Sequence, residues 1–467
     1  MKQQNDVLLK VDHLCQYFRL GRKDLKAVDD VNFEIRKGEA FGLVGESGCG
    51  KTTTGRSIIR LYNITSGNVY FKGERIGAGT RSYKDAIKAA REDADIRIDR
   101  LIEASYAEPE KAKEYKKRID EIDRQLAEII QKNKQLIREA KGNTKAVDRR
   151  YSEALLKALE EEYAPKLKAA ENDPQKLKAL RKEFKIRSRV AKRAQLITQI
   201  QMIFQDPIAS LDPRMTVREI IAEGLIIQGI TDKEYINEKV YEILEMVGLV
   251  REHADRYPHE FSGGQRQRIG IARAVIMQPE MLIADEPISA LDVSIQAQVI
   301  NLLNDLRDRL GLTILFIAHD LSVVKYFSDR IGVMYFGKMV ELADSDELFR
   351  HPIHPYTRSL LSAIPLPDPV YEKQRERETY NPLQAHDYSV EQPTFREIAP
   401  GHMVLCNPRS MSVISLSTRE ENTSRPKRAF PWPPLPWLCP WQSRIASERS
   451  RESCASLRSH LRSSVLP

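Results

Sequence analysis

The chain has 467 residues, of which 41% are hydrophobic and 30% charged, and its formal net charge is +8. This length allows one large domain with additions or two to three smaller ones, and the composition excludes a chain that is disordered throughout. No apolar run approaches the roughly 18 residues of a membrane-spanning helix, and the polar start of the chain lacks the apolar core of a signal peptide. We therefore expect a cytosolic protein without a membrane span.

The positive charge is unevenly distributed. Residues 80–195 contain 31 Lys and Arg against 22 Asp and Glu, and residues 410–467 contain 9 against 4. The rest of the chain has a net charge of −6. The basic excess therefore lies in two segments that look like additions, and it does not indicate that the main domain binds nucleic acid.

The first 79 residues have the pattern of a β-rich region. Short apolar runs at residues 7–11, 31–35 and 40–44 predict strands, and the last run ends on a glycine-rich loop followed by a predicted helix. Residues 67–73 predict a further strand and turn.

At about residue 80 the sequence changes character. Residues 80–195 contain one glycine, and 53 of these 116 residues are charged, so we expect helices there and neither strands nor a buried core. A 3,4 spacing of apolar residues supports this expectation, at Ile119, Ile122, Leu126, Ile129 and Leu136.

Two local signals suggest how this helical segment is organised. Asp173 before Pro174 predicts a helix N-cap, and Gly142-Asn143 predicts a bend between two arms. We therefore predict a long antiparallel helical hairpin, with arms of about 35 residues that span about 50 Å at 1.5 Å per residue. A solvated hairpin and a docking arm for anionic lipid or a partner are both open interpretations.

Globular character returns between residues 200 and 368. Helix patterns at residues 217–228 and 236–247 precede strand patterns at 281–284 and 313–318, which together predict an α/β block. Beyond residue 410 the sequence is rich in serine and has no periodicity, which indicates a disordered tail or out-of-frame coding.

A phosphate-binding loop is predicted at residues 45–52, where GESGCGKT matches GxxxxGK[ST] between a predicted strand and a predicted helix. Backbone N–H groups of such a loop surround phosphates, the lysine neutralises the outer phosphates, and the hydroxyl after it can ligate Mg²⁺. The candidate residues are Ser47, Gly48, Cys49, Gly50, Lys51, Thr52 and Thr53. A thiol at the position of Cys49 can be acidified by the helix N-terminus, with packing as the alternative role.

Four further candidate residues lie at the ends of three apolar runs. Asp285 and Glu286 end the run at residues 281–284, which suits Asp285 to hold Mg²⁺ and Glu286 to act as general base on an attacking water. Gln205 and His319 follow two other apolar runs. A fourth motif, SGGQ at residues 262–265, opens a helix pattern and so presents backbone N–H groups to an anion.

In this order the motifs resemble those of the nucleotide-binding subunit of ATP-binding-cassette (ABC) transporters. Residues 45–52 resemble the Walker A loop and Asp285-Glu286 the Walker B end. The remaining correspondences are Gln205 to the Q-loop, Ser262, Gly263, Gly264 and Gln265 to the signature, residues 289–292 ending at Asp292 to the D-loop, and His319 to the switch histidine. The resemblance covers residues 7–79 and 200–368.

The resemblance implies an α/β P-loop NTPase fold, with a RecA-like core, an antiparallel β subdomain and a helical subdomain. It divides the chain into residues 1–79 and 200–340 of the ATPase domain, a helical insert at 80–199, an extension at 341–409 and a tail at 410–467.

The same family mechanism implies an ATP site shared by two subunits, with ATP and Mg²⁺ as cofactors. Glu286, His319 and Gln205 would serve in hydrolysis, while Thr52, Gln205 and Asp285 would hold the metal. Phe18, or its neighbour Tyr17, would stack on adenine.

A further stretch resembles one subfamily of importers. HPIHPYTRSLL at residues 351–361 resembles an element found beyond the ATPase core of oligopeptide, dipeptide and nickel importers, and residues 204–207, 257–261 and 292–298 resemble its F-type subunit. The implied partners are a homologous D-type ATPase subunit, two permeases and an external peptide-binding protein, with no nucleic acid, at the cytoplasmic face of the membrane.

Two other functions share part of these sequence features. A nickel importer shares the same motifs, and a soluble coiled-coil ATPase of DNA-repair type shares the helical insert but not the HPYT element.

The five scattered cysteines predict no disulfide framework or zinc site, and only Cys406 matches the cysteine cluster of relatives. One thiolate cannot hold an iron–sulfur cluster, so we expect none.

Overall fold

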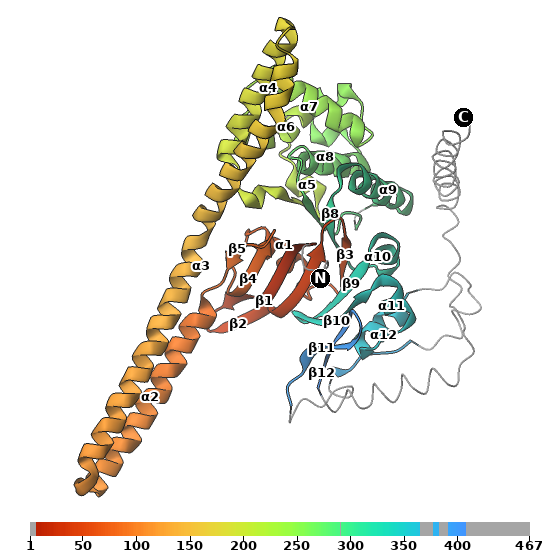
Figure 1. The fold of residues 1–467 in the computed structure, drawn as a ribbon. Coiled ribbons are helices and arrows are strands. Elements are labelled where there is room, and N and C mark those ends of the chain that lie inside the picture. The colour runs from red at the N-terminus through yellow and green to blue at the C-terminus, as the bar shows by residue number, and fades with distance from the viewer. Residues whose placement is uncertain (1–5, 290, 365–376, 383–390, 408–467) are drawn as a thin grey trace, which may run out of the picture. The chain divides into compact units, whose positions relative to one another are not determined.

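Two β-sheets form the centre of the fold (Figure 1). The computed structural model describes residues 6–289, 291–364, 377–382 and 391–407, and these belong to one compact unit, Met1–Asn407. The predicted tail at residues 410–467 lies outside the described residues.

The smaller sheet is antiparallel, with the order β2-β1-β4-β5. Its strands are β1 (Val7–Leu20), β2 (Lys23–Arg36), β4 (Ser66–Phe71) and β5 (Glu74–Ala78). The predicted strands are confirmed here, but β1 and β2 are each 14 residues long because they pair with each other as far as Leu20 and Lys23. The apolar runs covered only part of each strand, since Leu14 of β1 and Val28 of β2 are also fully buried.

The larger sheet has eight strands in the order β11-β12-β10-β9-β3-β8-β7-β6. Its strands are β3 (Ala40–Val44), β6 (Ile200–Ile203), β7 (Met281–Asp285), β8 (Thr313–Ala318), β9 (Arg330–Tyr335), β10 (Lys338–Asp344), β11 (Thr394–Ala399) and β12 (His402–Cys406). The strands β9, β3, β8, β7 and β6 run parallel, and every residue of β3, β7 and β8 is buried. Because both faces of these strands are covered, their sequences are continuously apolar instead of alternating.

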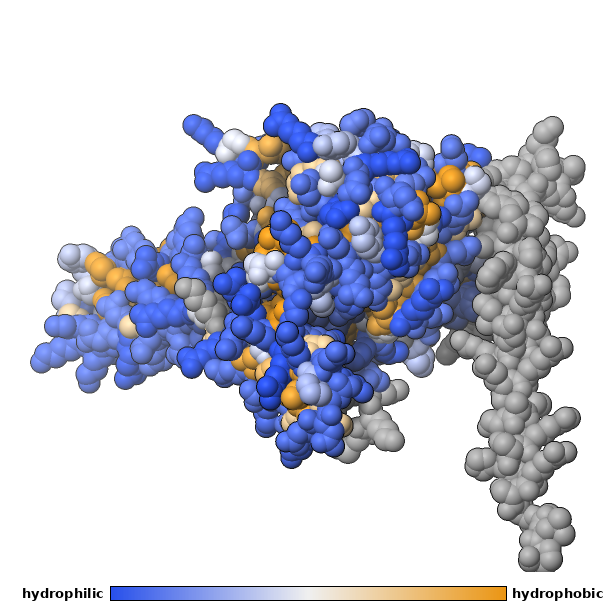
Figure 2. Space-filling view, turned by 90° about the horizontal axis from the view of Figure 1, so that it is seen from above, coloured by the Kyte–Doolittle hydropathy of each residue, from blue (hydrophilic) through white to orange (hydrophobic). Residues whose placement is uncertain are grey.

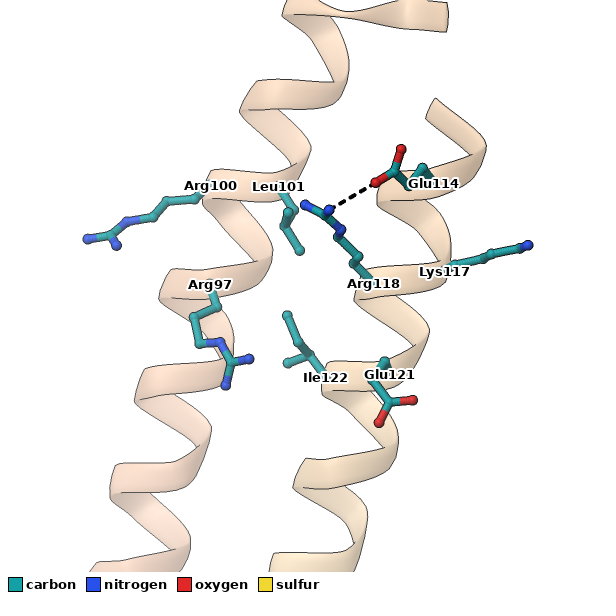
Figure 3. A pocket seen from close by; sticks show the side chains of 8 residues that line it. All are labelled: Arg97, Arg100, Leu101, Glu114, Lys117, Arg118, Glu121 and Ile122. Atoms are coloured by element: carbon teal, nitrogen blue, oxygen red, sulfur yellow. Dashed lines mark hydrogen bonds and ion pairs between the residues drawn. The ribbon is translucent and has the colours of Figure 1, made fainter. Parts of the chain in front are cut away.

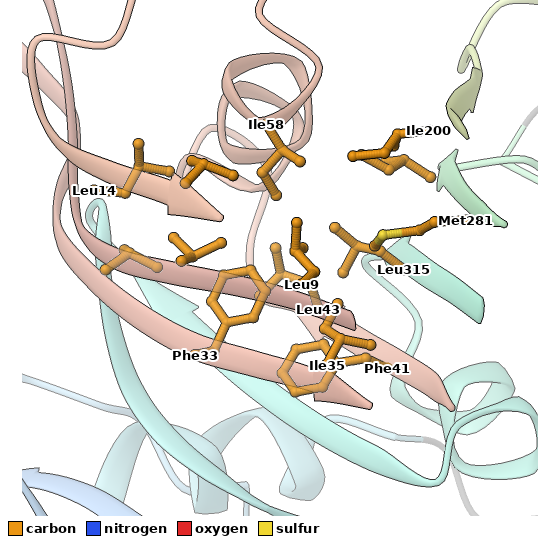
Figure 4. Packing of buried hydrophobic residues seen from close by; sticks show 14 of the residues in the cluster. Leu9, Leu14, Phe33, Ile35, Phe41, Leu43, Ile58, Ile200, Met281 and Leu315 are labelled. Atoms are coloured by element: carbon orange, nitrogen blue, oxygen red, sulfur yellow. The ribbon is translucent and has the colours of Figure 1, made fainter. Parts of the chain in front are cut away.

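The hydrophobic core joins the two sheets (Figure 4). Leu9 and Phe33 of the smaller sheet pack with Phe41 and Leu43 of β3, and the rings of Phe33 and Phe41 stack with centroids 5.2 Å apart. Ile58, at the end of α1 (Lys51–Ile58), is fully buried in the same cluster. Burial of each such side chain stabilises the fold by about 1.5–3 kcal/mol, so the helix that follows the phosphate loop is firmly held.

A group of helices follows β6. These are α5 (Pro207–Ser210), α6 (Val217–Ile227), α7 (Lys233–Met246) and α8 (Gly263–Val275), with 3₁₀ turns η3 (Arg251–Asp255) and η4 (Pro258–Glu260). The predicted helices are confirmed, and each begins at a side-chain cap: Thr216 and Glu219 form a capping box at α6, and Asp232 caps α7. After β7 and β8 come α9 (Val293–Leu310) and α10 (Leu321–Phe327).

The charged segment after β5 forms three helices. They are α2 (Arg81–Ala107), α3 (Ala112–Ala169) and α4 (Pro174–Arg193), with 3₁₀ turns η1 (Pro109–Lys111) and η2 (Leu196–Gln199). In Figure 1, α2 lies along one part of α3 and α4 along another, in agreement with their packing contacts. Figure 3 shows Leu101 of α2 and Ile122 of α3 between the two helices.

The predicted bend at Gly142-Asn143 is wrong. The 58-residue helix α3 runs through both positions, and the chain reverses instead at residues 108–111 and 170–173. One glycine costs a helix interior only about 1 kcal/mol relative to alanine, which the packing of a long helix easily exceeds. The predicted cap at Asp173 is confirmed, since its carboxylate accepts hydrogen bonds from the N–H groups of Gln175 and Lys176, both at 3.1 Å.

The expectation that this segment has no buried core is also wrong. Val147 of α3 is 2% exposed and belongs to the central hydrophobic cluster. Tyr163 of α3 is 1% exposed and packs on Phe184 of α4, with ring centroids 5.4 Å apart. Single large side chains were enough to build these contacts, although the surrounding sequence is mostly charged.

The segment after β10 packs back onto that strand. It contains α11 (Ser345–Arg350) and α12 (Pro355–Ser362) before β11 and β12.

The face of the molecule that Figure 2 shows is mostly hydrophilic, with separate apolar patches. Among the described residues, no helix combines the length and the apolar character needed to cross a bilayer.

Candidate functional site

The candidate residues come together at one edge of the larger sheet. Parallel strands β3, β8, β7 and β6 are neighbours, and the loops after them begin with Gly45, His319, Glu286 and, one residue later, Gln205. Since the carboxyl ends of parallel strands meet at the same edge, four segments distant in sequence form one site.

The loop between β3 and α1 has the backbone shape of a phosphate cradle. Gly45 and Gly50 have φ of 149° and 106°, and a Cβ atom would lie 2.2 Å from the Met334 carbonyl oxygen at Gly45 and 2.3 Å from the Ala27 carbonyl oxygen at Gly50. Both positions therefore require glycine. Helix α1 begins at Lys51, directly after this turn, so its free N–H groups face the loop.

Lys51 is 4% exposed and holds the loop from inside. Its Nζ atom donates to the carbonyl oxygens of Gly45 and Glu46, at 2.8 and 2.9 Å. Ser47 and Gly48 are exposed at the tip of the loop, whereas Thr53 is half-buried on α1. The cation is thus placed beside the concave side of the turn, where phosphates are expected.

Cys49 is a buried packing residue. Burial raises the pKa of its thiol, and the nearby Lys51 ammonium, whose Nζ is 3.8 Å from Sγ, opposes this shift only in part. The alternative of an acidified thiol is therefore wrong, because the desolvation cost exceeds the attraction of the lysine and the helix N-terminus.

Thr52 and Asp285 form the candidate magnesium site. The Thr52 hydroxyl donates to Oδ1 of Asp285 at 2.7 Å, and Asp285 is fully buried at the end of β7. Burial raises the pKa of Asp285 above its ordinary range. Its second oxygen, Oδ2, is buried without a hydrogen-bond partner, and the nearest cation is Arg56 at 3.9 Å. A buried carboxylate oxygen without a partner, beside a hydroxyl, fits a hard divalent cation.

Glu286 lies between two polar side chains. Its Oε2 accepts a hydrogen bond from Nε2 of Gln205 at 2.9 Å, and Nδ1 of His319 is 3.4 Å from the same oxygen. The backbone of Glu286 is left-handed, with φ of 43°, which is costly for a residue with a side chain. Such strain, together with two polar neighbours, is typical of a functional position.

The SGGQ segment is well formed at the start of α8. Ser262 caps α8, and Ser262 and Gln265 form a capping box. Asp292 precedes α9 and makes no side-chain cap, and Ala290 beside it lies outside the described residues. Within the described part of the chain, no hydrogen bond or ion pair joins residues 262–265 to residues 45–52.

Comparison with known proteins assigns this site to a family. The profile of the ABC transporter family matches residues 28–150 and 154–289, which is more than half of the chain. The chain belongs to the ABC transporter family. A second profile, the C-terminal region of oligopeptide/dipeptide transporters, matches residues 340–389.

Curated ABC transporter proteins match nearly along their whole length. The oligopeptide transport ATP-binding protein OppF of Bacillus subtilis is 46% identical over 410 residues, covering 87% of this chain and 99% of the relative. OppF of Streptococcus mutans is 42% identical, covering 87% and 96%. AmiF of Streptococcus pneumoniae is 41% identical, covering 87% and 97%. This ABC protein is accordingly an ATPase.

The two candidate adenine-stacking residues of this ABC ATPase differ in their surroundings. The Tyr17 hydroxyl donates to Asp29 at 2.5 Å, and the cations of Lys26 and Arg81 lie 5.3 and 5.8 Å from its ring centroid. Phe18 makes an edge contact with Tyr62, with centroids 5.2 Å apart. Tyr17 is therefore held by polar partners, which leaves Phe18 as the better candidate.

Two residues of the ABC site were missed by sequence reasoning. Arg56 lies one helical turn after Thr52 on α1, so its approach to Asp285 could have been found from the i,i+4 spacing. The second is Tyr356, whose hydroxyl accepts a hydrogen bond from the backbone N–H of Glu46 at 3.0 Å. No local signal connects these two positions, because 310 residues separate them.

Proposed function

We propose that this chain is the ATP-hydrolysing subunit that powers the import of oligopeptides or dipeptides. The observation that supports it most directly is the 46% identity to OppF of Bacillus subtilis, over 87% of this chain and 99% of the relative. The match of residues 340–389 to the oligopeptide/dipeptide transporter profile points the same way. These similarities favour a peptide over nickel as the imported solute, and a transporter over a DNA-repair ATPase.

Each group at the sheet edge receives a role in this proposal. Lys51 and the N–H groups of the loop bind the phosphates, with Phe18 against the adenine. Thr52, Asp285 and Gln205 hold Mg²⁺, which when bound supplies charge neutralisation at the phosphates. Glu286 accepts a proton from the attacking water, and His319 and Gln205 orient its carboxylate and the γ-phosphate.

A second ATPase subunit completes the proposed site. Ser262, at the N-terminus of α8, and Asp292, at that of α9, offer polar groups that no contact of the described residues brings to the phosphate loop of the same chain. We assign them to the γ-phosphate held by a partner. The partner is a homologous D-type ATPase, with this chain as the F-type subunit of the pair.

The permease contact is proposed for the region beside Gln205. A pocket of about 130 Å³ is lined by Gln205, Gly263 and Leu291, so the Q-loop, the signature segment and the D-loop share one space. Ile208, in the lining of this pocket, is 64% exposed, and Ile226 and Ile227, at the end of α6, are 55% and 73% exposed. We name these three isoleucines the apolar patch. Such exposure suits a docking surface for two permease subunits at the cytoplasmic face of the membrane.

We also propose assignments for the remaining segments of the chain and for its other partners. Residues 80–199 are an insert into the ATPase domain, and residues 341–409 are an extension of it. An external peptide-binding protein delivers the solute, and no nucleic acid is bound. We expect no iron–sulfur cluster, since Cys406 is a buried residue of β12 whose thiol pKa is raised by burial.

The test is purification of the tagged chain from native membranes, followed by identification of the co-purified proteins. Recovery of a homologous ATPase and two permeases is the expected result, with ATP hydrolysis stimulated by the peptide-binding protein loaded with peptide. Recovery of DNA-bound or ribosomal proteins in place of permeases would overturn the proposal. Stimulation by nickel and not by peptides would reassign the solute.

A further inference from the structure

The basic excess of the insert is concentrated in one helix. Of the 20 residues of α4, nine are Lys or Arg and one, Glu183, is acidic. This helix therefore has a net charge of +8, compared with +9 for all of residues 80–195. Of the two longer helices, α2 is balanced, with six basic and six acidic residues, and α3 has 15 basic against 11 acidic residues over 58 positions.

Five of these cations lie on one face of α4. Lys178, Arg181, Lys185, Arg189 and Lys192 fall within an arc of about 80° at 3.6 residues per turn and extend over about 21 Å of helix. All five are exposed, and within the described residues none of them forms an ion pair. We name these five residues the basic stripe.

The other faces of α4 are occupied by packing and ion pairs. Leu177, Leu180 and Phe184 are half-buried, and Phe184 packs on Tyr163 of α3. Arg187 pairs with Glu162 and Glu183 at 3.8 and 3.0 Å. The helix is therefore anchored by its packed face, and the basic stripe lies on an exposed face whose cations form no ion pair within the described residues.

Contacts of α4 with the turn between α6 and α7 determine where the basic stripe lies. Lys182, at its edge, forms an ion pair with Asp232 at 2.6 Å, and Asp232 also caps α7. Arg193 fills the space beside Gly229, where a Cβ atom would lie 2.6 Å from its Nη1. The turn between α6 and α7 directly follows Ile226 and Ile227 of the apolar patch. The basic stripe and the proposed permease surface are thus joined through one short turn.

The groove between α2 and α3 does not present such a row of unpaired cations. It has a volume of about 520 Å³ and is lined by both signs of charge (Figure 3). Arg118 pairs with Glu114 at 2.9 Å, and Arg97 pairs with Asp93 at 3.4 Å. Two of its four cations are therefore paired locally, and two carboxylates, Glu114 and Glu121, lie in the same lining, so it does not offer a comparable row of unpaired cations.

We propose that the basic stripe binds anionic phospholipid headgroups of the membrane beside the permease. This inference rests on the proposed function, which brings the apolar patch to the membrane surface. Each unpaired Lys or Arg near an anionic leaflet strengthens binding on the order of fivefold. The stripe contains no aromatic side chain on which bases could stack, and a straight row of cations on one helix suits a flat charged surface better than single-stranded nucleic acid.

The test uses the purified full-length chain and flotation with vesicles of phosphatidylcholine, with or without phosphatidylglycerol. The stripe variant replaces Lys178, Arg181, Lys185, Arg189 and Lys192 by Gln. A matched control replaces five exposed lysines of α3 by Gln, namely Lys113, Lys116, Lys117, Lys132 and Lys134. We expect binding only to phosphatidylglycerol vesicles, loss of at least about tenfold in affinity in the stripe variant, and a much smaller loss in the control.

Further measurements show whether the stripe variant is still folded and whether binding is electrostatic. ATP hydrolysis and the melting temperature of the stripe variant should equal those of the parent, and raising the salt concentration should release the parent from the vesicles. Equal losses in both variants, undiminished binding of the stripe variant, or equal binding to phosphatidylcholine alone would overturn the proposal. Displacement from the vesicles by RNA at matched phosphate concentration would reassign the stripe to nucleic acid. Failure to recover permeases would overturn the proposed function but not vesicle binding, so the two failures are distinguishable.

Discussion

The backbone N–H of Glu46, in the phosphate loop, donates a hydrogen bond to the hydroxyl of Tyr356, on α12, at 3.0 Å. Tyr356 is 1% exposed, and its ring packs on Tyr335 with centroids 4.4 Å apart. On the other side of the same residue, the Glu46 carbonyl accepts from Lys51 at 2.9 Å. Tyr356 of α12 therefore helps to hold the shape of the proposed phosphate-binding loop.

Tyr356→Phe should weaken ATP binding while keeping the fold. Loss of one hydrogen bond costs about 0.5–1.5 kcal/mol, or roughly a two- to tenfold rise in the Kd for ATP. Fluorescent-nucleotide titration measures this. Tyr335→Phe is the control, because the Tyr335 hydroxyl makes no hydrogen bond within the described residues. Equal effects of the two variants would show that ring packing, not the hydroxyl, matters.

Glu286→Gln should leave ATP binding intact and reduce turnover by about 10²–10⁴-fold, since the amide cannot accept the proton of water. The substituted side chain has the same size and remains within reach of Gln205 and His319. Steady-state phosphate release and nucleotide titration separate the two effects. Normal turnover in this variant would remove Glu286 from the proposed mechanism.

Acidification should weaken Mg²⁺-dependent nucleotide binding at a pH above the usual range of an aspartate. Burial raises the pKa of Asp285 in the folded state above its value in the unfolded state. Between these two pKa values the folded state binds more protons than the unfolded state, so the free energy of unfolding falls as pH rises. As pH falls through the folded-state pKa, the carboxyl takes up a proton and loses its affinity for the metal. Calorimetric titration with Mg²⁺ and ATP across pH measures this. Asp285→Asn should show weak binding without that pH dependence, and an identical pH profile would contradict the assignment.

A buried pair fastens the C-terminal extension to β10. Glu341 is fully buried and accepts from the N–H groups of Ile353 and His354, at 2.8 and 3.0 Å, and from Nε2 of His402 at 2.7 Å. Glu341→Ala should lower the free energy of unfolding by about 3–5 kcal/mol, because three donors, two of them buried, lose their acceptor. Urea denaturation measures the loss. Glu347→Ala serves as the control, since Glu347 is 44% exposed and 3.8 Å from His402, and should change stability by less than about 1 kcal/mol.

The sequence by itself determined the motifs and most of the regular elements. Glycine spacing at residues 45–52, the apolar runs before Asp285 and His319, and the cap at Asp173 are local signals, and local signals specify local structure. The same reasoning failed at Gly142, where a weak helix breaker was outweighed by packing along α3. It also marked β1 and β2 too short, because strand length depends on pairing with a neighbour.

Only the tertiary structure decided which distant residues meet. The register of β7 with β8 and β6 brings Glu286 to His319 and Gln205, and the return of the extension along β10 brings Tyr356 to Glu46. The position of the basic stripe beside the turn between α6 and α7 likewise depends on the pair of Lys182 with Asp232. Such contacts are set by sheet order and by the packing of one core, and neither is encoded within any short stretch of sequence.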